Sequence, residues 1–402
     1  MRLCITIVII AALLSTSYAQ AQISDGVVRI GVLNDQSSLY ADAAGPGSVI
    51  AAQMAVEDFG PVGPGIKVEV VSADHQNKPD IGSGIVRRWL DVGGVDAIVD
   101  LPNSGVALAV NEIVRGTKQA LLASSTASSD LTGKACSPNT VQWTFDTWSI
   151  ANATVKSVVE RGGSSWFFLT ADYAFGYALE RDAAAAIAAN GGKVVGSVHH
   201  PIGTSDFSSF LLQAQASKAK VVGLANAGGD TITAIKQAAE FGIPQGGQSL
   251  AALLVFISDI NSIGLQTAQG LLFTAAFYWD LNDGTREWSR RFAAHNNGKM
   301  PTMNHAGVYS SILAYLAAVE ATNSDDGPVV VAKMKEGPIQ DKLFGRVVVR
   351  ADGRATHAMY LFRAKKPEES KGAWDYYRLI NTIPADQAFR PLDQGGCALV
   401  QK

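Results

Sequence analysis

Two polar stretches, each directly after a short apolar run, are the first candidates for binding chemistry. One follows Ala97–Leu101 and opens a predicted helix, and the other follows Ala120–Ser124. The residues of interest in these stretches are Asn103, Ser104, Ser125, Thr126 and Ala127. Ser104 is predicted to cap the helix, whose free N–H groups favour an anion. Hydroxyl and amide groups can hold a carboxylate without a full counter-charge, although the same residues also serve as simple caps and turns.

Aromatic side chains come at other predicted strand ends. They are Tyr40, Tyr173, Phe175, Tyr278 and Trp279. Aromatic residues usually belong to a core, but a loop position favours a place in the wall of a binding cleft. We therefore predict that these rings line the same site as the hydroxyl-rich stretches.

Motifs for catalysis or for a bound cofactor do not stand out. There is no Gly-x-Ser-x-Gly elbow and no P-loop, and Gly45-Pro46-Gly47 lacks the third glycine of a dinucleotide fingerprint. His199 and His200 are adjacent, but no histidine or cysteine spacing matches a metal site. We predict a protein that is not an enzyme and has no cofactor or metal; a secreted α/β hydrolase is the remote alternative.

The elements that position these residues alternate regularly along the chain. Predicted strands are Val27–Leu33, Ile66–Ser72, Ala97–Leu101, Ala120–Ser124, Trp166–Thr170, Lys193–His199, Val221–Ala225, Leu253–Ser258 and Gly270–Phe277. Helical patterns lie between them, for example Gly47–Phe59 and Gly176–Asn190. Such alternation is typical of an α/β fold, with parallel sheets covered by helices on both faces.

The strand–helix series runs twice, which predicts two doubly wound lobes joined by a multi-strand hinge. The predicted first lobe is residues 22–145 plus 278–345, and the second is 146–277 plus 346–385. A tail follows at 386–402. Open parallel sheets bind ligands outside the carboxyl ends of their strands, so two facing lobes place all these loops around one cleft.

The N-terminus predicts export. Arg2 precedes the apolar run Leu3–Leu14, and small residues follow, so residues 1–21 resemble a cleaved signal peptide. Export of this kind places the protein in the periplasm. Removing the segment deletes one of 33 basic residues and none of 36 acidic ones, giving 32 − 36 = −4. This weakly acidic chain has no basic stripe for nucleic acid.

Cysteine usage predicts one covalent link. Cys4 leaves with the signal segment, so Cys136 and Cys397 remain as a pair in an oxidising compartment. A bridge between them ties the C-terminal tail to the first half of the chain. The alternative is two unrelated free thiols.

The order of several short motifs resembles periplasmic solute-binding proteins of the leucine/isoleucine/valine type, class I. The motifs are Ile30–Asp35, Ala51–Asp58, Asp172–Gly176, Tyr278–Asp280, Arg350–Arg354 and Phe389–Cys397. The last three resemble a branch that includes receptors for aromatic acids. The resemblance spans nearly the whole mature chain.

This resemblance implies roles for individual residues. A serine after the third strand, here Ser104, and the groups of residues 125–127 are expected to grip a ligand carboxylate. The nearest match to the acid that holds an ammonium group in amino-acid binders is Asp259, and Phe175 stands where a tyrosine is usual. The implied ligand is a small carboxylate, either an aromatic acid or an apolar or branched-chain amino acid.

The resemblance also implies a function and partners. The expected function is the substrate-binding component of an ABC importer, which closes about its hinge on the ligand and docks on a membrane permease. A monomer is expected from the same likeness. The alternative role is a receptor that senses the ligand and feeds a signalling partner.

Overall fold

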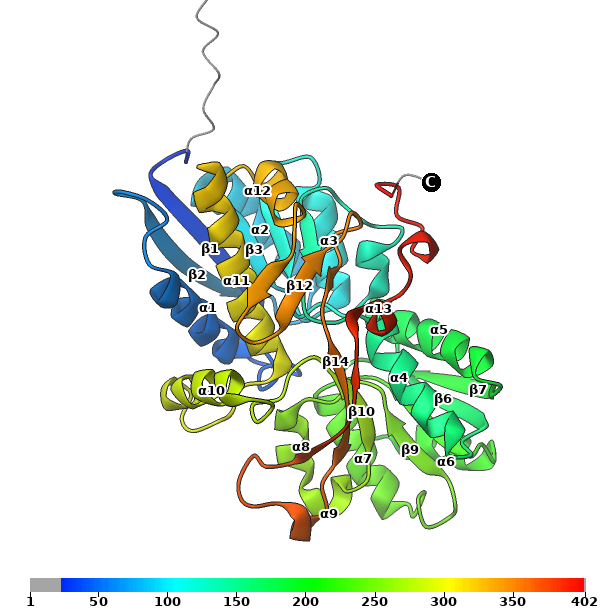
Figure 1. Ribbon diagram of the computed structural model, residues 1–402. Coiled ribbons are helices and arrows are strands. Elements are labelled where there is room, and N and C mark those ends of the chain that lie inside the picture. The colour runs from blue at the N-terminus through cyan, green and yellow to red at the C-terminus, as the bar shows by residue number, and fades with distance from the viewer. Residues whose placement is uncertain (1–22, 401–402) are drawn as a thin grey trace, which may run out of the picture.

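The computed structural model describes residues 23–400, in two lobes stacked one on the other (Figure 1). The signal peptide predicted over residues 1–21 lies outside the described residues. The predicted α/β class with parallel sheets is confirmed. None of the helices among residues 23–400 combines the length and the apolar character that a membrane crossing needs.

The first lobe is built on a five-stranded parallel sheet in the order β2-β1-β3-β4-β5. Its strands are β1 Val27–Asn34, β2 Lys67–Asp74, β3 Ala97–Asp100, β4 Ala120–Ala123 and β5 Thr140–Gln142. Its helices include α1 Gly45–Phe59, α2 Pro79–Arg88 and α3 Ser104–Val114, and later α11 Met303–Thr322 and α12 Gly327–Met334. The central strands β3 and β4 are buried along their whole length, which explains their continuous apolar runs.

Alternate side chains of this sheet enter two separate cores. Ile98 and Leu121 pack with α2 and α3. Val99 and Leu122 belong to the other cluster, which includes residues of α1 and α11. Because successive strand residues point to opposite faces, a fully apolar strand is needed where helices cover both faces.

The second lobe repeats the arrangement with a four-stranded parallel sheet in the order β7-β6-β8-β9. Its strands are β6 Ser165–Ala171, β7 Lys193–His200, β8 Val221–Ala225 and β9 Ser249–Ala252. Its helices are α4 Thr147–Glu160, α5 Ala174–Ala189, α6 Ser208–Ala216, α7 Gly229–Glu240, α8 Ile257–Ile263 and α9 Leu265–Ala268.

The strand predicted at Leu253–Ser258 is wrong. The strand ends at Ala252, and α8 begins at Ile257. Residues 253–256 are nevertheless buried, because they form an apolar loop beneath the other lobe rather than a strand inside the sheet. A short apolar run does not by itself distinguish these two situations.

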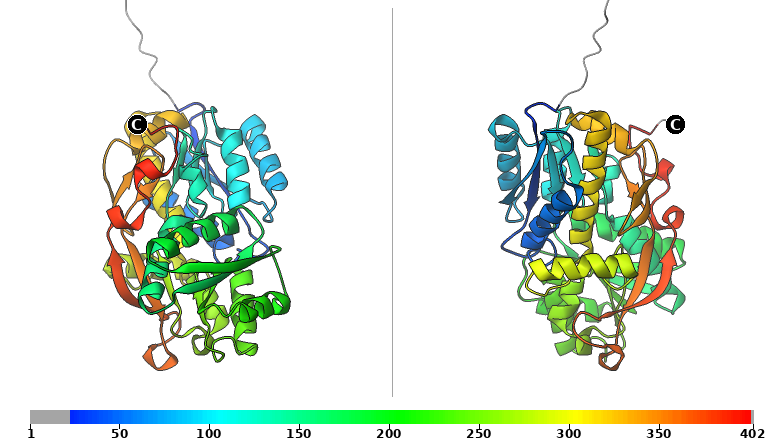
Figure 2. Two further views of the ribbon diagram at one scale, coloured as in Figure 1. Left: turned by 90° about the vertical axis from the view of Figure 1, so that its right-hand side faces the viewer. Right: turned by 60° about the vertical axis from the view of Figure 1, so that its left-hand side comes forward.

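Several segments connect the lobes. β10 Leu272–Ala275 pairs with β14 Met359–Ala364, which pairs with β15 Tyr377–Ile383. In both views of Figure 2, β14 and β15 (orange to red) run along one side of the molecule from lobe to lobe. α10 Asp283–His295 lies near the level where the lobes meet (Figure 1).

The strand pairing bears on where the lobes divide. β11 Ile339–Asp341, β12 Gly345–Val349 and β13 Ala355–Thr356 form one small antiparallel sheet. The backbone of Arg354, next to this sheet, forms an isolated parallel β-bridge with Gln142 of the first lobe. We therefore propose that the first lobe continues to about residue 356 rather than ending at 345.

The disulfide between Cys136 and Cys397 is confirmed, with Cα atoms 5.6 Å apart. It fixes the tail that follows α13 Ala385–Ala388 against the first lobe. The Arg390 guanidinium adds a hydrogen bond of 3.1 Å to the carbonyl of Ser129. The tail thus belongs to the first lobe, although the strand before it lies in the second.

Candidate functional site

Both sheets have a point at which the winding reverses. In the first lobe, β1 lies between β2 and β3, the two strands that follow it in the chain. In the second lobe, β6 lies in the same way between β7 and β8. Loops after such strands diverge to opposite faces and leave a crevice at the carboxyl edge. The candidate site is formed where the two crevices face each other.

A narrow cavity of about 10 Å³ lies at this place. Its wall contains Tyr40, Pro102, Ser125, Ala127, Tyr173, Phe175, Ala227, Leu254, Phe256 and Asn304. These residues follow β1, β3, β4, β6, β8 and β9, except for Asn304 at the start of α11. The lobes thus stand close together here, and a ligand needs them to part before it can enter.

Tyr40 is presented by a loop that the buried carboxylate of Asp35 organises. This carboxylate accepts hydrogen bonds from the backbone N–H of Ser38 at 3.0 Å and of Tyr40 at 2.7 Å. The Asn77 side chain donates to it as well, at 2.6 Å. An aspartate that accepts from nearby amides fixes a turn without regular secondary structure. In the opening motif, Asp35 therefore fixes the conformation of the loop that carries Tyr40.

Tyr173 and Phe175 sit where β6 turns directly into α5. The turn is tight: a side chain on Gly176 would collide with the backbone of Ala171 at the strand end. α5 has no side-chain cap, so its first N–H groups have no capping partner. Glycine at this position thus allows the α5 N-terminus to lie against the cavity.

The two lobes touch across the cavity. The phenol groups of Tyr40 and Tyr173 share a short hydrogen bond. Beside it, Gly228 has φ +59°, and a Cβ there would come within 2.7 Å of the Leu39 carbonyl oxygen. Only glycine is compatible with both the positive φ and this close approach. These contacts hold the lobes together on the open side of the cleft.

Ser125 is held by an acid behind the wall. Its hydroxyl donates to the buried carboxylate of Asp100, which also accepts from the Asn34 amide at 2.8 Å. Burial raises the pKa of Asp100 to about 6, against the lowering effect of these hydrogen bonds. Asp100 and Leu101 have φ of +89° and +58°, rare for residues with a Cβ. Such strain at a strand end is often found at functional sites.

The backbone after β4 offers free donors. Within the described residues, the amides of Thr126 and Ala127 have no protein acceptor, whereas the neighbouring amides of Ser125 and Ser128 do. The Thr126 hydroxyl is used elsewhere, since it donates to the Leu101 carbonyl at 2.6 Å. The two free N–H groups can therefore receive an anion, and Ala127 lines the cavity.

Asn103 and Ser104 have different positions from those predicted. The cap of α3 is Asn103, whose side chain accepts from the amides of Gly105 and Val106. Ser104 is fully buried, and its hydroxyl accepts from the Ser128 amide at 3.1 Å. Neither side chain is part of the cavity wall. The assignment of Ser104 as the cap was wrong, because the residue one position earlier has the extended backbone of an N-cap.

Asp259 also stands apart from the cavity. It is the third residue of α8, and its carboxylate accepts from the Phe256 amide at 2.9 Å. Burial raises the pKa of Asp259 to about 7. Asp259 therefore lies behind the wall in the first turn of α8, whereas Phe256 lines the cavity.

Tyr278 and Trp279 lie in the connection between β10 and α10, outside the cavity wall. Trp279 donates from its indole nitrogen to the Trp374 carbonyl at 2.7 Å, and Tyr278 stacks on Tyr377 with ring centroids 4.8 Å apart. Tyr278 thus packs against β15, and Trp279 bonds the loop between β14 and β15. Their strand-end position was predicted, but the chain there turns away from the cavity.

Five wall residues were not predicted from the sequence: Pro102, Ala227, Leu254, Phe256 and Asn304. Pro102 and Ala227 follow predicted strands, so a systematic reading of every strand end would have found them. Leu254 and Phe256 were missed because they lie inside the run wrongly predicted as the strand Leu253–Ser258. Asn304 had no such signal, because it belongs to a long helix far along the chain. It reaches the cavity only because α11 starts at the lobe boundary.

The wall has an unusual electrostatic character for an ion-binding site. None of the residues that line it is Lys, Arg, Asp or Glu. Pro102, Phe175, Phe256 and Asn304 stand at or just before the N-termini of α3, α5, α8 and α11. Helix N-termini carry positive partial charge, so the cavity favours an anion without any cationic side chain.

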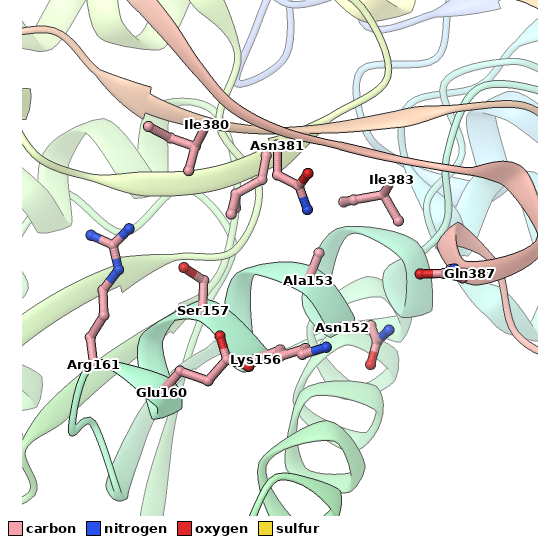
Figure 3. A pocket seen from close by; sticks show the side chains of 11 residues that line it. Asn152, Ala153, Lys156, Ser157, Glu160, Arg161, Ile380, Asn381, Ile383 and Gln387 are labelled. Carbon is pink, nitrogen blue, oxygen red and sulfur yellow. The ribbon is translucent and has the colours of Figure 1, made fainter.

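A larger hollow of about 420 Å³ lies on the outside of the second lobe, open to solvent (Figure 3). It runs between α4 and β15 and is bordered by Lys156, Glu160, Arg161, Asn381 and Gln387. Charges of both signs border it, and no strand end of either parallel sheet opens into it. It is separate from the cavity between the lobes.

Residues 27–373 match the family described as periplasmic binding protein. This chain belongs to that family. Its fold and family are those of solute-binding proteins rather than of enzymes. The chain is 47% identical to a periplasmic binding protein from Burkholderia mallei, with a TM-score of 0.92, over 94% of this chain and 100% of that one.

A second similar structure is a branched chain amino acid ABC transporter periplasmic ligand-binding protein from Burkholderia xenovorans. It is 41% identical over 92% of this chain and 99% of that one, with a TM-score of 0.81. A third, a solute-binding protein from R. palustris in complex with 4-hydroxybenzoate, is 21% identical over 89% and 97%, with a TM-score of 0.80. The last likeness is one of fold alone. The predicted resemblance to binding proteins of the leucine/isoleucine/valine type is confirmed.

Proposed function

We propose that this protein is the periplasmic receptor of an ABC importer and that it binds a small aromatic monocarboxylate between its lobes. The observation that carries the choice of ligand is the composition of the cavity wall. The wall combines aromatic side chains, free amides and helix N-termini with a complete lack of charged side chains. Such a wall fits a flat anion that bears no ammonium group.

The carboxylate is expected at the side formed by the loop after β4. Two amides of that loop, at Thr126 and Ala127, have no acceptor among the described residues, and Ser125 lies beside them. The N-termini of α3 and α5 add their dipoles from both lobes. An anion held by several N–H groups in a dry site needs no cationic partner.

An amino acid fits this wall less well. Its ammonium group needs an acidic or other strong acceptor when it is buried. Asp259 accepts from the Phe256 amide, and Asp230, on α7, accepts from the Gly203 amide at 3.1 Å with one oxygen, while its other oxygen is buried without a partner among the described residues. Neither acid is part of the wall, and the residues that follow β9 there, Leu254 and Phe256, are apolar. The wall itself therefore lacks the acid that an amino-acid binder needs.

The aromatic side chains define where a ring can lie. Tyr173 and Phe175 have ring centroids 5.8 Å apart, and Phe256 lines the cavity from the position just before α8 of the same lobe. Rings in such a setting attract another ring through offset or edge contacts. The name of the R. palustris relative's complex, with 4-hydroxybenzoate, agrees with this class of ligand.

The central experiment is calorimetric titration of the purified protein with benzoate, 4-hydroxybenzoate, phenylalanine and leucine. Leucine is included because the Burkholderia xenovorans relative is named for branched chain amino acids. We expect at least one aromatic acid to bind with Kd in the micromolar range or below, which is about 8 kcal/mol. Tighter binding of leucine than of either aromatic acid, abolished by Asp230→Asn or Asp259→Asn, would refute the ligand class.

A pair of matched variants tests the site itself. Phe175→Leu removes a ring from the cavity wall, and Phe210→Leu removes one from the half-buried surface of α6 in the same lobe. We expect Phe175→Leu to weaken aromatic-acid binding at least tenfold and Phe210→Leu to leave it unchanged. Equal effects of the two variants on Kd would place the ligand elsewhere.

The mechanism we propose is closure of the lobes about the connecting strands. The hydrogen bond between Tyr40 and Tyr173 joins first and second lobe and can form only when the lobes meet. Tyr173→Phe removes it while keeping the ring, so Kd should rise about fivefold, since one such bond contributes about 1 kcal/mol. Stopped-flow fluorescence should find the change in the dissociation rate; an unchanged Kd would mean that this bond does not stabilise the closed state.

A further inference from the structure

Asn304 is the polar side chain of the cavity wall that the protein leaves without a partner. It is 1% exposed, and its carbonyl oxygen is buried with no hydrogen bond to the described protein atoms. No hydrogen bond from its side-chain nitrogen to a described residue is found either. The other polar side chains of the wall have partners, because Ser125 donates to Asp100 and the two tyrosines bind each other.

The backbone around Asn304 is fixed in place. Thr302 caps α11 by accepting from the Asn304 amide at 3.2 Å, and the Thr302 hydroxyl donates to the Ala43 carbonyl at 2.6 Å. The next residue, His305, bonds the Ala44 carbonyl through its ring at 2.8 Å. These bonds join the start of α11 to the start of α1. The backbone that carries the Asn304 carboxamide is therefore held at the cavity wall.

A buried carboxamide without a partner is costly, and proteins usually satisfy such groups. An amide presents both a donor and an acceptor, whereas a carboxylate can only accept. A hydroxyl group, which donates and accepts, is the ligand group that matches the Asn304 carbonyl and nitrogen together. A purely apolar ring edge leaves both unsatisfied.

We infer that Asn304 is a specificity-determining residue that selects a ligand carrying a hydroxyl group in addition to its carboxylate. The inference rests on the proposed function. The carboxylate takes the free amides after β4, the ring lies against Phe175, and the hydroxyl group exchanges hydrogen bonds with Asn304. The substrate class is thus a hydroxylated aromatic acid, preferred over the unsubstituted acid.

The test is a calorimetric series with benzoate, 3-hydroxybenzoate and 4-hydroxybenzoate against the wild type, Asn304→Leu and Asn152→Leu. Leucine has nearly the shape of asparagine without its polar atoms, and Asn152 lies in the outer hollow of Figure 3. In the wild type, at least one hydroxybenzoate should bind about tenfold or more tightly than benzoate. Asn304→Leu should remove this preference, so that the hydroxybenzoates and benzoate bind with similar Kd.

The control and the possible failures are distinct. Asn152→Leu should keep the wild-type preference, and a thermal melt of each variant shows whether it is folded. Equal binding of all three acids by the wild type, or an unchanged preference in folded Asn304→Leu, overturns the role of Asn304 and leaves the proposed function in place. Failure of all three acids to bind overturns the proposed function and this inference with it.

Discussion

Replacing Arg354 by methionine should strongly destabilise the protein. Its guanidinium is completely buried yet charged, since burial lowers its pKa only to about 10. It donates to the carbonyls of Trp143, of Phe145 at 2.8 Å and of Ala355 at 2.9 Å. The first two carbonyls lie just before α4, where the chain passes from the first lobe to the second.

The magnitude follows from what the substitution leaves behind. Three buried carbonyl groups lose a donor, and each such loss costs about 1 kcal/mol or more. Asp146, whose carboxylate is 3.7 Å from the Arg354 guanidinium, loses its nearest positive charge. Removing one partner of a buried ionic contact costs about 3–5 kcal/mol, so together with the carbonyl groups we expect a total loss of about 6 kcal/mol or more. Methionine retains much of the contact with the Phe389 ring, over which the guanidinium lies at 4.7 Å.

Urea unfolding followed by circular dichroism measures this loss, with Arg346→Met as the matched control. Arg346 lies in β12 of the same small sheet, but its side chain is exposed and has no hydrogen bond to a described residue. The control should lose less than about 0.5 kcal/mol, as surface substitutions usually do. If Arg354→Met lost no more than Arg346→Met, the reasoning from buried carbonyl groups would be refuted.

Three further outcomes are expected. Ser104→Ala should lower the free energy of unfolding by about 1–2 kcal/mol in urea titrations, because the buried Ser128 amide loses its acceptor; unchanged stability would show that this amide finds another partner. Burial lowers the pKa of His305 to about 4, so below pH 6.5 this imidazole is protonated in the unfolded chain but stays neutral in the folded protein. Stability is therefore lost as pH falls from 6.5 toward 4, and His305→Gln should reduce the loss between pH 7 and 5 by about 2 kcal/mol, whereas an identical pH profile would contradict the assignment. Replacing Cys136 and Cys397, which are 261 residues apart, by serine should lower the melting temperature. By the chain-entropy argument the disulfide contributes at most about 6 kcal/mol to the free energy of unfolding. A melting temperature that dithiothreitol does not change would contradict this contribution.

The sequence predicted the fold well because the relevant signals are local. Apolar runs such as Ala120–Ser124 must be strands covered on both faces, and the helical patterns between them fix a doubly wound order. Leu253–Ser258 was misread because burial under the opposite lobe produces the same apolar run as burial inside a sheet. The pattern reports burial and not the element that is buried.

The candidate site was predicted only in part. Tyr40, Ser125, Ala127, Tyr173 and Phe175 do lie in the cavity wall, as expected for residues after parallel strands. Their contact with a ligand stays a prediction.

Other positions depend on details that spacing does not determine. The hydroxyls of Ser104 and Thr126 are engaged with nearby backbone groups, and Tyr278 turns toward Tyr377. Asn304 arrives from a helix that begins where the lobes meet. Its place depends on the three-dimensional path of the chain between the lobes.

The return of the tail to the first lobe has a practical consequence for immobilising the protein or fusing it to another domain. The first described residues and the C-terminal tail both lie on the upper side of the first lobe, away from the second (Figure 1). A surface linker or a reporter domain fused after Cys397 would therefore be attached to the first lobe and would leave the second lobe free to move. The chain's own connectivity makes it a natural scaffold for a biosensor in which a dye on the second lobe reports the arrival of the ligand.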